Sequence, residues 1–75
     1  MTVIAVSGYF DPIHVGHLEY LKIAKSLGDK LVVIVNSDYQ AELKKGKSFM
    51  PEADRLEIVG SLRCVDEVFL SIDKD

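Results

Sequence analysis

Three short apolar runs alternate with two segments of helical periodicity, and this alternation limits the possible folds of the 75-residue chain more than any other feature. The runs cover residues 2–7, 31–35 and 68–72, and they are too short for helices and rich in β-branched side chains, which favours strands. Because continuous apolar strands are typically buried on both faces, the runs predict a parallel sheet.

The two intervening segments predict amphipathic helices. In residues 15–27 apolar side chains recur at steps of three, and further apolar side chains widen this stripe. Gly28 follows and is expected to end the helix. Pro51 suits the first position of a second helix that extends to about Leu62, with acidic residues in its first turn. The predicted apolar positions are Leu18, Tyr20, Leu21, Ile23, Ala24 and Leu27 in the first helix, and Leu56, Ile58, Val59 and Leu62 in the second.

The order strand, helix, strand, helix, strand predicts one fold class. Parallel strands joined by helices cross over in a right-handed sense, which produces one mononucleotide-binding half of a doubly wound fold. We therefore expect a Rossmann-like, three-layer α/β/α architecture with a parallel sheet, formed by residues 1–75 as a single domain. Residues 39–49 show no sustained period and predict a loop, with one helical turn near residues 39–43.

Charge and composition exclude several classes of function. The net charge of −3 argues against a nucleic-acid binder, which needs a basic surface to replace counterions on phosphates. No run approaches the roughly 20 apolar residues of a membrane span, and the first residues lack the basic lead of a signal peptide. A single cysteine, Cys64, cannot form an intrachain disulfide. These observations predict a soluble, cytoplasmic protein with no nucleic-acid or membrane partner.

The stretch Gly8-Tyr9-Phe10-Asp11-Pro12-Ile13-His14-Val15-Gly16-His17 holds both histidines of the chain. It follows the first strand, and ligands of open parallel sheets bind at that end, beside the turns into the next helices. A helix that begins near Val15 also directs free amides and its positive dipole end into this crevice. Glycines at 8 and 16 permit close approach to the backbone, so the stretch predicts a phosphate site.

The two imidazoles are the candidate catalytic groups of this stretch. At this spacing His14 and His17 can both direct N–H donors at one phosphate group, where they stabilise charge that develops during transfer. Taken singly, each is more often a partly exposed polar residue at a helix start. A zinc site lacks a third ligand, and Cys64 has no evident approach to the histidines for nucleophilic catalysis, so no metal ligands are assigned.

Three motifs carry a resemblance to a known family. The segment GYFDPIHVGH resembles the HxGH signature of the nucleotidyltransferase superfamily, and SLGDKLVVIVNSD resembles the second strand of its cytidylyltransferase-like branch. The run from Arg55 to Arg63-Cys64-Val65-Asp66-Glu67-Val68 is similar to a third motif of that branch. The resemblance is greatest to glycerol-3-phosphate cytidylyltransferase and to the heptose-phosphate and ethanolamine-phosphate nucleotidyltransferases.

The resemblance implies roles for particular residues. His14, His17 and a loop lysine, best matched by Lys44, would be catalytic, with Lys47 as the second lysine candidate. Arg55 and Arg63 would support the site or a dimer contact. The full set of expected nucleotide- or phosphate-binding residues is Gly8, Tyr9, Phe10, Asp11, Gly16, Lys47 and Arg55.

The implied reaction transfers CMP or AMP from CTP or ATP to a small phosphorylated alcohol or sugar, with Mg²⁺ and release of pyrophosphate. Family members are longer, so the chain is expected to correspond to the N-terminal half of a catalytic domain. A truncated binding or assembly module without turnover is the alternative. A sheet ending at its first strand also leaves an unpaired edge, which predicts a homodimer.

Overall fold

The computed structural model describes residues 1–39 and 50–71. They form a parallel three-stranded sheet and two helices, in the predicted order. The elements are β1 (Val3–Gly8), α1 (Val15–Ser26), β2 (Lys30–Val35), α3 (Glu52–Gly60) and β3 (Glu67–Leu70). The strand order is β1-β2-β3, with Val3 opposite Lys30 and Val32 opposite Glu67. The Rossmann-like half-domain predicted from the sequence is confirmed.

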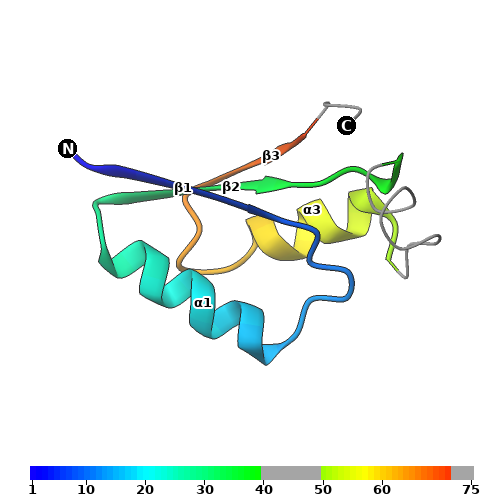
Figure 1. Ribbon diagram of the computed structural model, residues 1–75, viewed down its shortest axis with the longest axis horizontal. Helices are drawn as coiled ribbons and strands as arrows, with labels where there is room; N and C mark the ends of the chain where they lie inside the picture. The colour runs from blue at the N-terminus through cyan, green and yellow to red at the C-terminus, as the bar shows by residue number, and fades with distance from the viewer. Residues whose placement is uncertain (40–49, 72–75) are drawn as a thin grey trace.

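Both helices cover the same face of the sheet (Figure 1). Two successive crossovers of the same hand, each to the next strand in one direction, place their helices on one side. The third layer of the expected α/β/α arrangement therefore has no helix among the described residues. As a result β2 is not buried on both faces as predicted: Leu31, Val33 and Val35 are buried, whereas the intervening Val32 and Ile34 are only half-buried.

The core lies between this sheet face and the two helices, where apolar side chains are removed from water. Its buried members are Phe10, Leu21, Ala24, Leu31, Val33, Val35, Val59 and Val65. Gly28 lets the chain return from α1 to β2 against β1, because a Cβ there would lie 2.9 Å from the Thr2 carbonyl oxygen. The predicted stop at Gly28 is thus confirmed, one residue after the C-cap Leu27.

The helix stripes are narrower than predicted. Of the wide stripe on α1, only Leu21 and Ala24 are buried; Ile23 and Leu27 are 63% and 68% exposed. Pro51 is the N-cap of α3 and not its first helical residue. The helical turn predicted at residues 39–43 lies almost wholly outside the described residues. No helix within the described ranges is long and apolar enough to cross a membrane.

Candidate phosphate-binding site

The N-terminus of α1 is capped by the two histidines themselves. His14 is the N-cap in extended conformation, and its Nδ1 accepts a hydrogen bond of 3.1 Å from the Gly16 N–H. In return, the Nδ1 of His17 accepts a hydrogen bond of 3.1 Å from the His14 N–H. This reciprocal arrangement is a capping box in which imidazoles replace the usual serine and glutamate.

The capping box determines where each imidazole carries its proton. A neutral imidazole has one donor and one acceptor nitrogen, and the Nδ1 atoms of His14 and His17 are both acceptors here. When neutral, both rings therefore carry the proton on Nε2, the atom farther from the helix backbone. Hydrogen bonds from the backbone thus fix both rings in the same tautomer, and the site holds two Nε2–H donors.

Ring packing keeps the two donors together. The centroids of the His14 and His17 rings lie 4.1 Å apart with their planes tilted by 40°, and the buried Phe10 meets His17 edge-on at 5.1 Å. Phe10 reaches this position with a left-handed backbone, φ 53°, directly after β1. His14 stays exposed and His17 half-buried, so the pair lies at the surface on a support of core residues.

Gly16 is required by the position of the His14 ring. A Cβ at this residue would lie 2.8 Å from Cε1 of His14, closer than real contacts allow. The Gly16 amide, expected from the sequence to face a phosphate, is instead occupied by the Nδ1 of His14. An anion at this helix mouth would therefore meet imidazole N–H groups in place of that backbone amide.

Acid should weaken this site. Burial, and secondarily the neighbouring His14, lower the pKa of His17 below its ordinary 6.5. The unfolded chain therefore binds this proton more readily than the folded chain does. The contribution of His17 to folding stability is fully present above about pH 6.5 and is lost as the pH falls through the lowered pKa. Protonation of Nδ1 also converts the acceptor of the His14 N–H into a donor and opens the capping box.

We therefore expect the melting temperature to decrease between pH 7 and pH 5, and the decrease to be smaller in His17→Asn. The asparagine side-chain oxygen can keep accepting the His14 N–H but does not titrate. Thermal melts followed by circular dichroism, with an NMR titration of the His17 ring, would measure both effects. An equally steep decrease in His17→Asn would contradict the assignment.

Arg55 connects the loops around this site. It is fully buried in α3, and its guanidinium donates to the backbone carbonyls of Tyr9, Asn36 and Met50 at 2.5–2.9 Å. It also forms an ion pair of 2.6 Å with Oδ1 of Asp38. One side chain thereby links the loop after β1, the loop after β2 and the start of α3, as expected of a residue that supports the site. Its contact with phosphate stays a prediction.

Asp11 makes a parallel connection. Its buried carboxylate accepts a 2.6 Å hydrogen bond from the Met50 N–H, so the histidine loop is attached to the chain immediately before α3. On the opposite side, the Asp38 N–H donates to Oε1 of Glu52 at 2.8 Å. Both carboxylates accept hydrogen bonds that hold the loops at the N-terminal end of α3.

The structure brings together part of the expected set. Gly8, Phe10, Gly16 and the two histidines form one cluster, in which a Cβ at Gly8 would meet the Phe10 ring at 3.0 Å. Tyr9, Asp11 and Arg55 form the supporting network beside it. Lys44 and Lys47 lie outside the described residues. Sequence reasoning missed Asn36, Asp38, Met50 and Glu52 as network partners; the only available signal was the polar Asn36-Ser37-Asp38 stop of β2.

In an open parallel sheet, ligands bind beside the carboxyl ends of the strands, and the histidine pair lies at the first such strand-to-helix turn. The family comparison is more specific. The model of the cytidylyltransferase-like family matches residues 5–75, and the chain belongs to that family. The resemblance inferred from the HxGH segment is thereby confirmed.

Curated relatives extend the comparison. The chain is 44% identical to the FAD synthase of Pyrococcus abyssi over 68 residues, covering 89% of this chain and 46% of that protein. It is 44% identical over its whole length to the FAD synthase of Methanohalophilus mahii, covering 52% of that protein. The bifunctional protein HldE of Streptomyces coelicolor is 46% identical over 69 residues, covering 89% of this chain but 15% of that protein. The chain thus spans about half the length of the FAD synthases.

A solved structure shows the same fold. The lipopolysaccharide core biosynthesis protein from Thermoplasma volcanium superposes with a TM-score of 0.93 at 37% sequence identity. The match covers all of this chain and 62% of that one.

Proposed function

We propose that the chain belongs to a nucleotidyltransferase that moves a nucleoside monophosphate from a triphosphate to a phosphorylated acceptor and releases pyrophosphate. The observation that supports this most is the capping box, which orients two Nε2–H donors beside each other at the mouth of α1. The first turn of α1 contains no acidic residue, so its positive dipole end is available to an anion.

The proposed chemistry needs positioning and charge stabilisation more than proton transfer. An acceptor phosphate has a second pKa near ~6, so it is already ionised at neutral pH and needs no general base. One of its oxygens bonds to the α-phosphorus as the bond to pyrophosphate breaks. His14 and His17 donate hydrogen bonds to the phosphate oxygens, and Lys44, with Lys47 as second candidate, neutralises charge from the loop side.

We also propose Mg²⁺ as the companion of the triphosphate. Within the described residues no group of three His, Cys, Asp or Glu side chains could hold a metal ion. Mg²⁺ would arrive with the nucleotide, because it prefers phosphate oxygens and water to an all-protein cage. When bound it would supply positive charge that offsets the charge of the phosphates.

The relatives refine the choice of substrates. Several are named FAD synthase, and FAD is formed when AMP is transferred from ATP to flavin mononucleotide. Flavin mononucleotide is a phosphorylated alcohol, which fits the acceptor class expected from the sequence. ATP with this acceptor is therefore our first pair, and CTP with a polyol or sugar phosphate is the second. The nucleotide substrates and the single thiol suit a reducing cytoplasm.

The test is a pyrophosphate-release assay with ATP or CTP and a panel of phosphorylated acceptors, including flavin mononucleotide and glycerol 3-phosphate. Release with one acceptor supports the proposal. The second candidate is a binding or assembly module without turnover, in which the same pair of imidazole donors would hold a nucleotide. Calorimetric binding of ATP or CTP with no detectable release would favour that module.

We further propose that the chain forms a homodimer through β1. In the sheet formed by the described residues this strand lies at the edge, and it contains neither charge nor proline to block pairing. Thr2 and Gly8 bond to β2 through their carbonyls, so by alternation the N–H groups of residues 3, 5 and 7 point to the free edge.

We expect light scattering to give the mass of a dimer at micromolar concentration and Ala5→Pro to shift it to a monomer. Proline removes one outward N–H and leaves the ladder with β2 intact. Ala5→Val is the control, since it keeps the amide. A monomer in the unmodified chain would contradict the proposal.

A further inference from the structure

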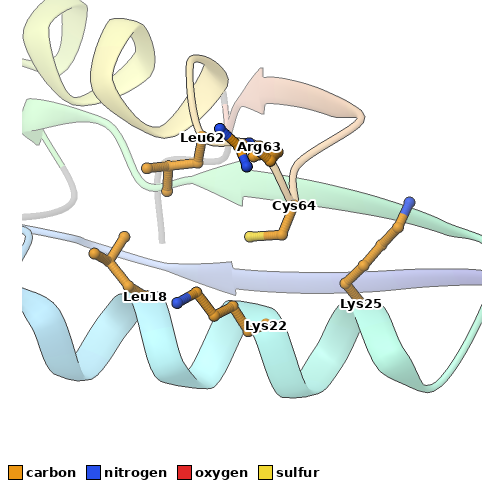
Figure 2. Close-up of a pocket in the computed structure, with 6 residues that line it drawn as sticks. All are labelled: Leu18, Lys22, Lys25, Leu62, Arg63 and Cys64. Atoms are coloured by element: carbon orange, nitrogen blue, oxygen red, sulfur yellow. The ribbon is translucent and has the colours of Figure 1, made fainter.

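A concave site lies beside α1, and neither histidine is among its lining residues. It occupies the space between α1 and the turn that joins α3 to β3 (Figure 2) and has a volume of about 410 Å³. This volume is within the range of roughly 300–1,000 Å³ that is typical of small-molecule sites. The lining residues are Leu18, Lys22, Lys25, Leu62, Arg63 and Cys64.

The lining combines an apolar floor with a cationic rim. Leu18 and Leu62 face each other across the groove, and the Cys64 thiol points into the space between them (Figure 2). Lys22 and Arg63 are exposed, and neither has an ion-pair or hydrogen-bond partner within residues 1–39 and 50–71. The groove is thus apolar inside and positively charged at its edge, on a chain whose net charge is −3.

Lys25 differs from the other two cations because it is fixed in place. Its Nζ donates to Oδ2 of Asp66 at 2.5 Å and to the Asp29 carbonyl at 3.0 Å. The same Asp66 oxygen accepts from the Leu31 N–H, which also lowers the pKa of Asp66 after the larger effect of Lys25. This network ties the end of α1 to the turn before β3, so the two walls of the groove are held at a set separation.

We propose that this groove binds a small organic anion, with its apolar body between Leu18 and Leu62 and its one carboxylate, sulfonate or phosphate group at Lys22 and Arg63. Small-molecule sites typically pair apolar walls with a few convergent polar groups, and all the charges free to act here are positive. The inference does not depend on the proposed nucleotidyl transfer, because none of its contacts involves the imidazole donors.

A neighbouring hollow gives the groove a physical route to the candidate phosphate site. It has a volume of about 240 Å³ and shares Leu18 and Leu62 with the groove, and His14 is also one of its lining residues. A ligand that displaces either leucine therefore also changes the surroundings of the His14 ring. NMR signals of that ring should shift when the groove fills.

The single cysteine allows a direct test. Because Cys64 is the only cysteine in the sequence, alkylation by iodoacetamide reports on the groove alone. The probe is 2-naphthalenesulfonate; 2-naphthol supplies the same rings without the anion, and inorganic phosphate supplies an anion without rings. With the sulfonate at twice its Kd, two thirds of the grooves are filled and alkylation should slow about threefold, whereas both controls should protect much less.

Charge variants identify the rim. Lys22→Gln and Arg63→Gln should each weaken the sulfonate about two- to fivefold, as expected for partly exposed ion pairs, and the double variant about tenfold. Ala53→Glu is the matched control, since it also lowers the net charge by one but lies on the exposed side of α3. Nitrogen–proton NMR shifts at Leu18 and Leu62 give a readout that does not require reaction at Cys64.

Three results would overturn the proposal. Equal protection by 2-naphthol would show that the anion is not recognised. Unchanged affinity in the double variant would place the sulfonate elsewhere. Protection of Cys64 that grows with protein concentration without any probe would show that a second copy of the chain covers the groove instead.

Discussion

Arg55→Ala is expected to lower the free energy of unfolding by about 3–5 kcal/mol, as is typical when one partner of a buried ion pair is removed. The substitution removes the guanidinium that donates to the carbonyls of Tyr9, Asn36 and Met50 and pairs with the Asp38 carboxylate. A 75-residue domain has a total stability of only about 4–11 kcal/mol, so the loss is a large share of it.

The size of the effect follows from burial. Arg55 has 0% exposure, so bulk water does not replace its lost hydrogen bonds as it would at the surface. Arg55→Lys keeps the charge but has three donors on one atom in place of a planar fork, and it should recover only part of the stability. Asp38→Asn should cost less, about 1 kcal/mol, because the carboxylate is 36% exposed.

Urea denaturation followed by circular dichroism measures these differences. The matched control is Arg63→Ala, an exposed arginine in the turn after α3, which should change stability by no more than about 0.5 kcal/mol. If Arg55→Ala is no more destabilising than Arg63→Ala, the loops are held together by something other than this side chain.

The importance of Arg55 could not be predicted from periodicity. A single arginine on a helix normally indicates a solvated face, and here three of its acceptors are backbone carbonyls, which no sequence pattern reveals. The strands and helices were predictable to within one or two residues, because short β-branched runs and steps of three or four are local signals. The contacts of Arg55 join segments up to 46 residues apart and depend on the tertiary fold.

The covered face of the sheet shows the same limit. The apolar run of β2 predicted burial on both faces, yet its side chains are fully buried on one face only. The helix pattern of α1 likewise includes Ile23 and Leu27, which remain exposed. Which positions are covered depends on the hand of the crossovers and on the neighbours that each layer has. Such facts belong to the assembled sheet and not to any one segment.

The histidine pair was predictable in position but not in detail. Its place after β1 and at the start of α1 follows from the order of elements. The capping box does not, because its usual pattern is serine or threonine followed three residues later by glutamate or glutamine. Here His14 and His17 occupy those positions, and only the geometry shows that their Nδ1 atoms are used.

This double role predicts that two substitutions of His17 will differ in stability and agree in lost function. Asparagine places an oxygen near the position of Nδ1 and can keep accepting the His14 N–H, but it lacks the distal donor. Alanine lacks both the acceptor and the distal donor. His17→Asn should therefore fold normally and fail in catalysis, whereas His17→Ala should lose both stability and catalysis.

The expected magnitudes differ enough to be measured. Removing one well-placed donor to a transferring phosphate costs about 100- to 1,000-fold in turnover, the loss expected for His17→Asn and His17→Ala in the pyrophosphate-release assay. If the chain only binds nucleotide, its affinity for ATP or CTP should fall at least about tenfold, since a hydrogen bond to a charged group contributes about 1.5–3 kcal/mol. Loss of the cap in His17→Ala should cost about 0.5–2 kcal/mol of stability.

His14 provides the internal comparison, because its ring has the same two nitrogens in the same roles but is more exposed. His14→Asn should reproduce the pattern of His17→Asn, with the asparagine oxygen accepting the Gly16 N–H. Should both asparagine variants retain full turnover and nucleotide affinity, the imidazoles would be helix caps and nothing more. If only the distal donors matter to function and only the Nδ1 atoms to stability, then four residues of sequence, His14-Val15-Gly16-His17, both begin the helix and bind the phosphate.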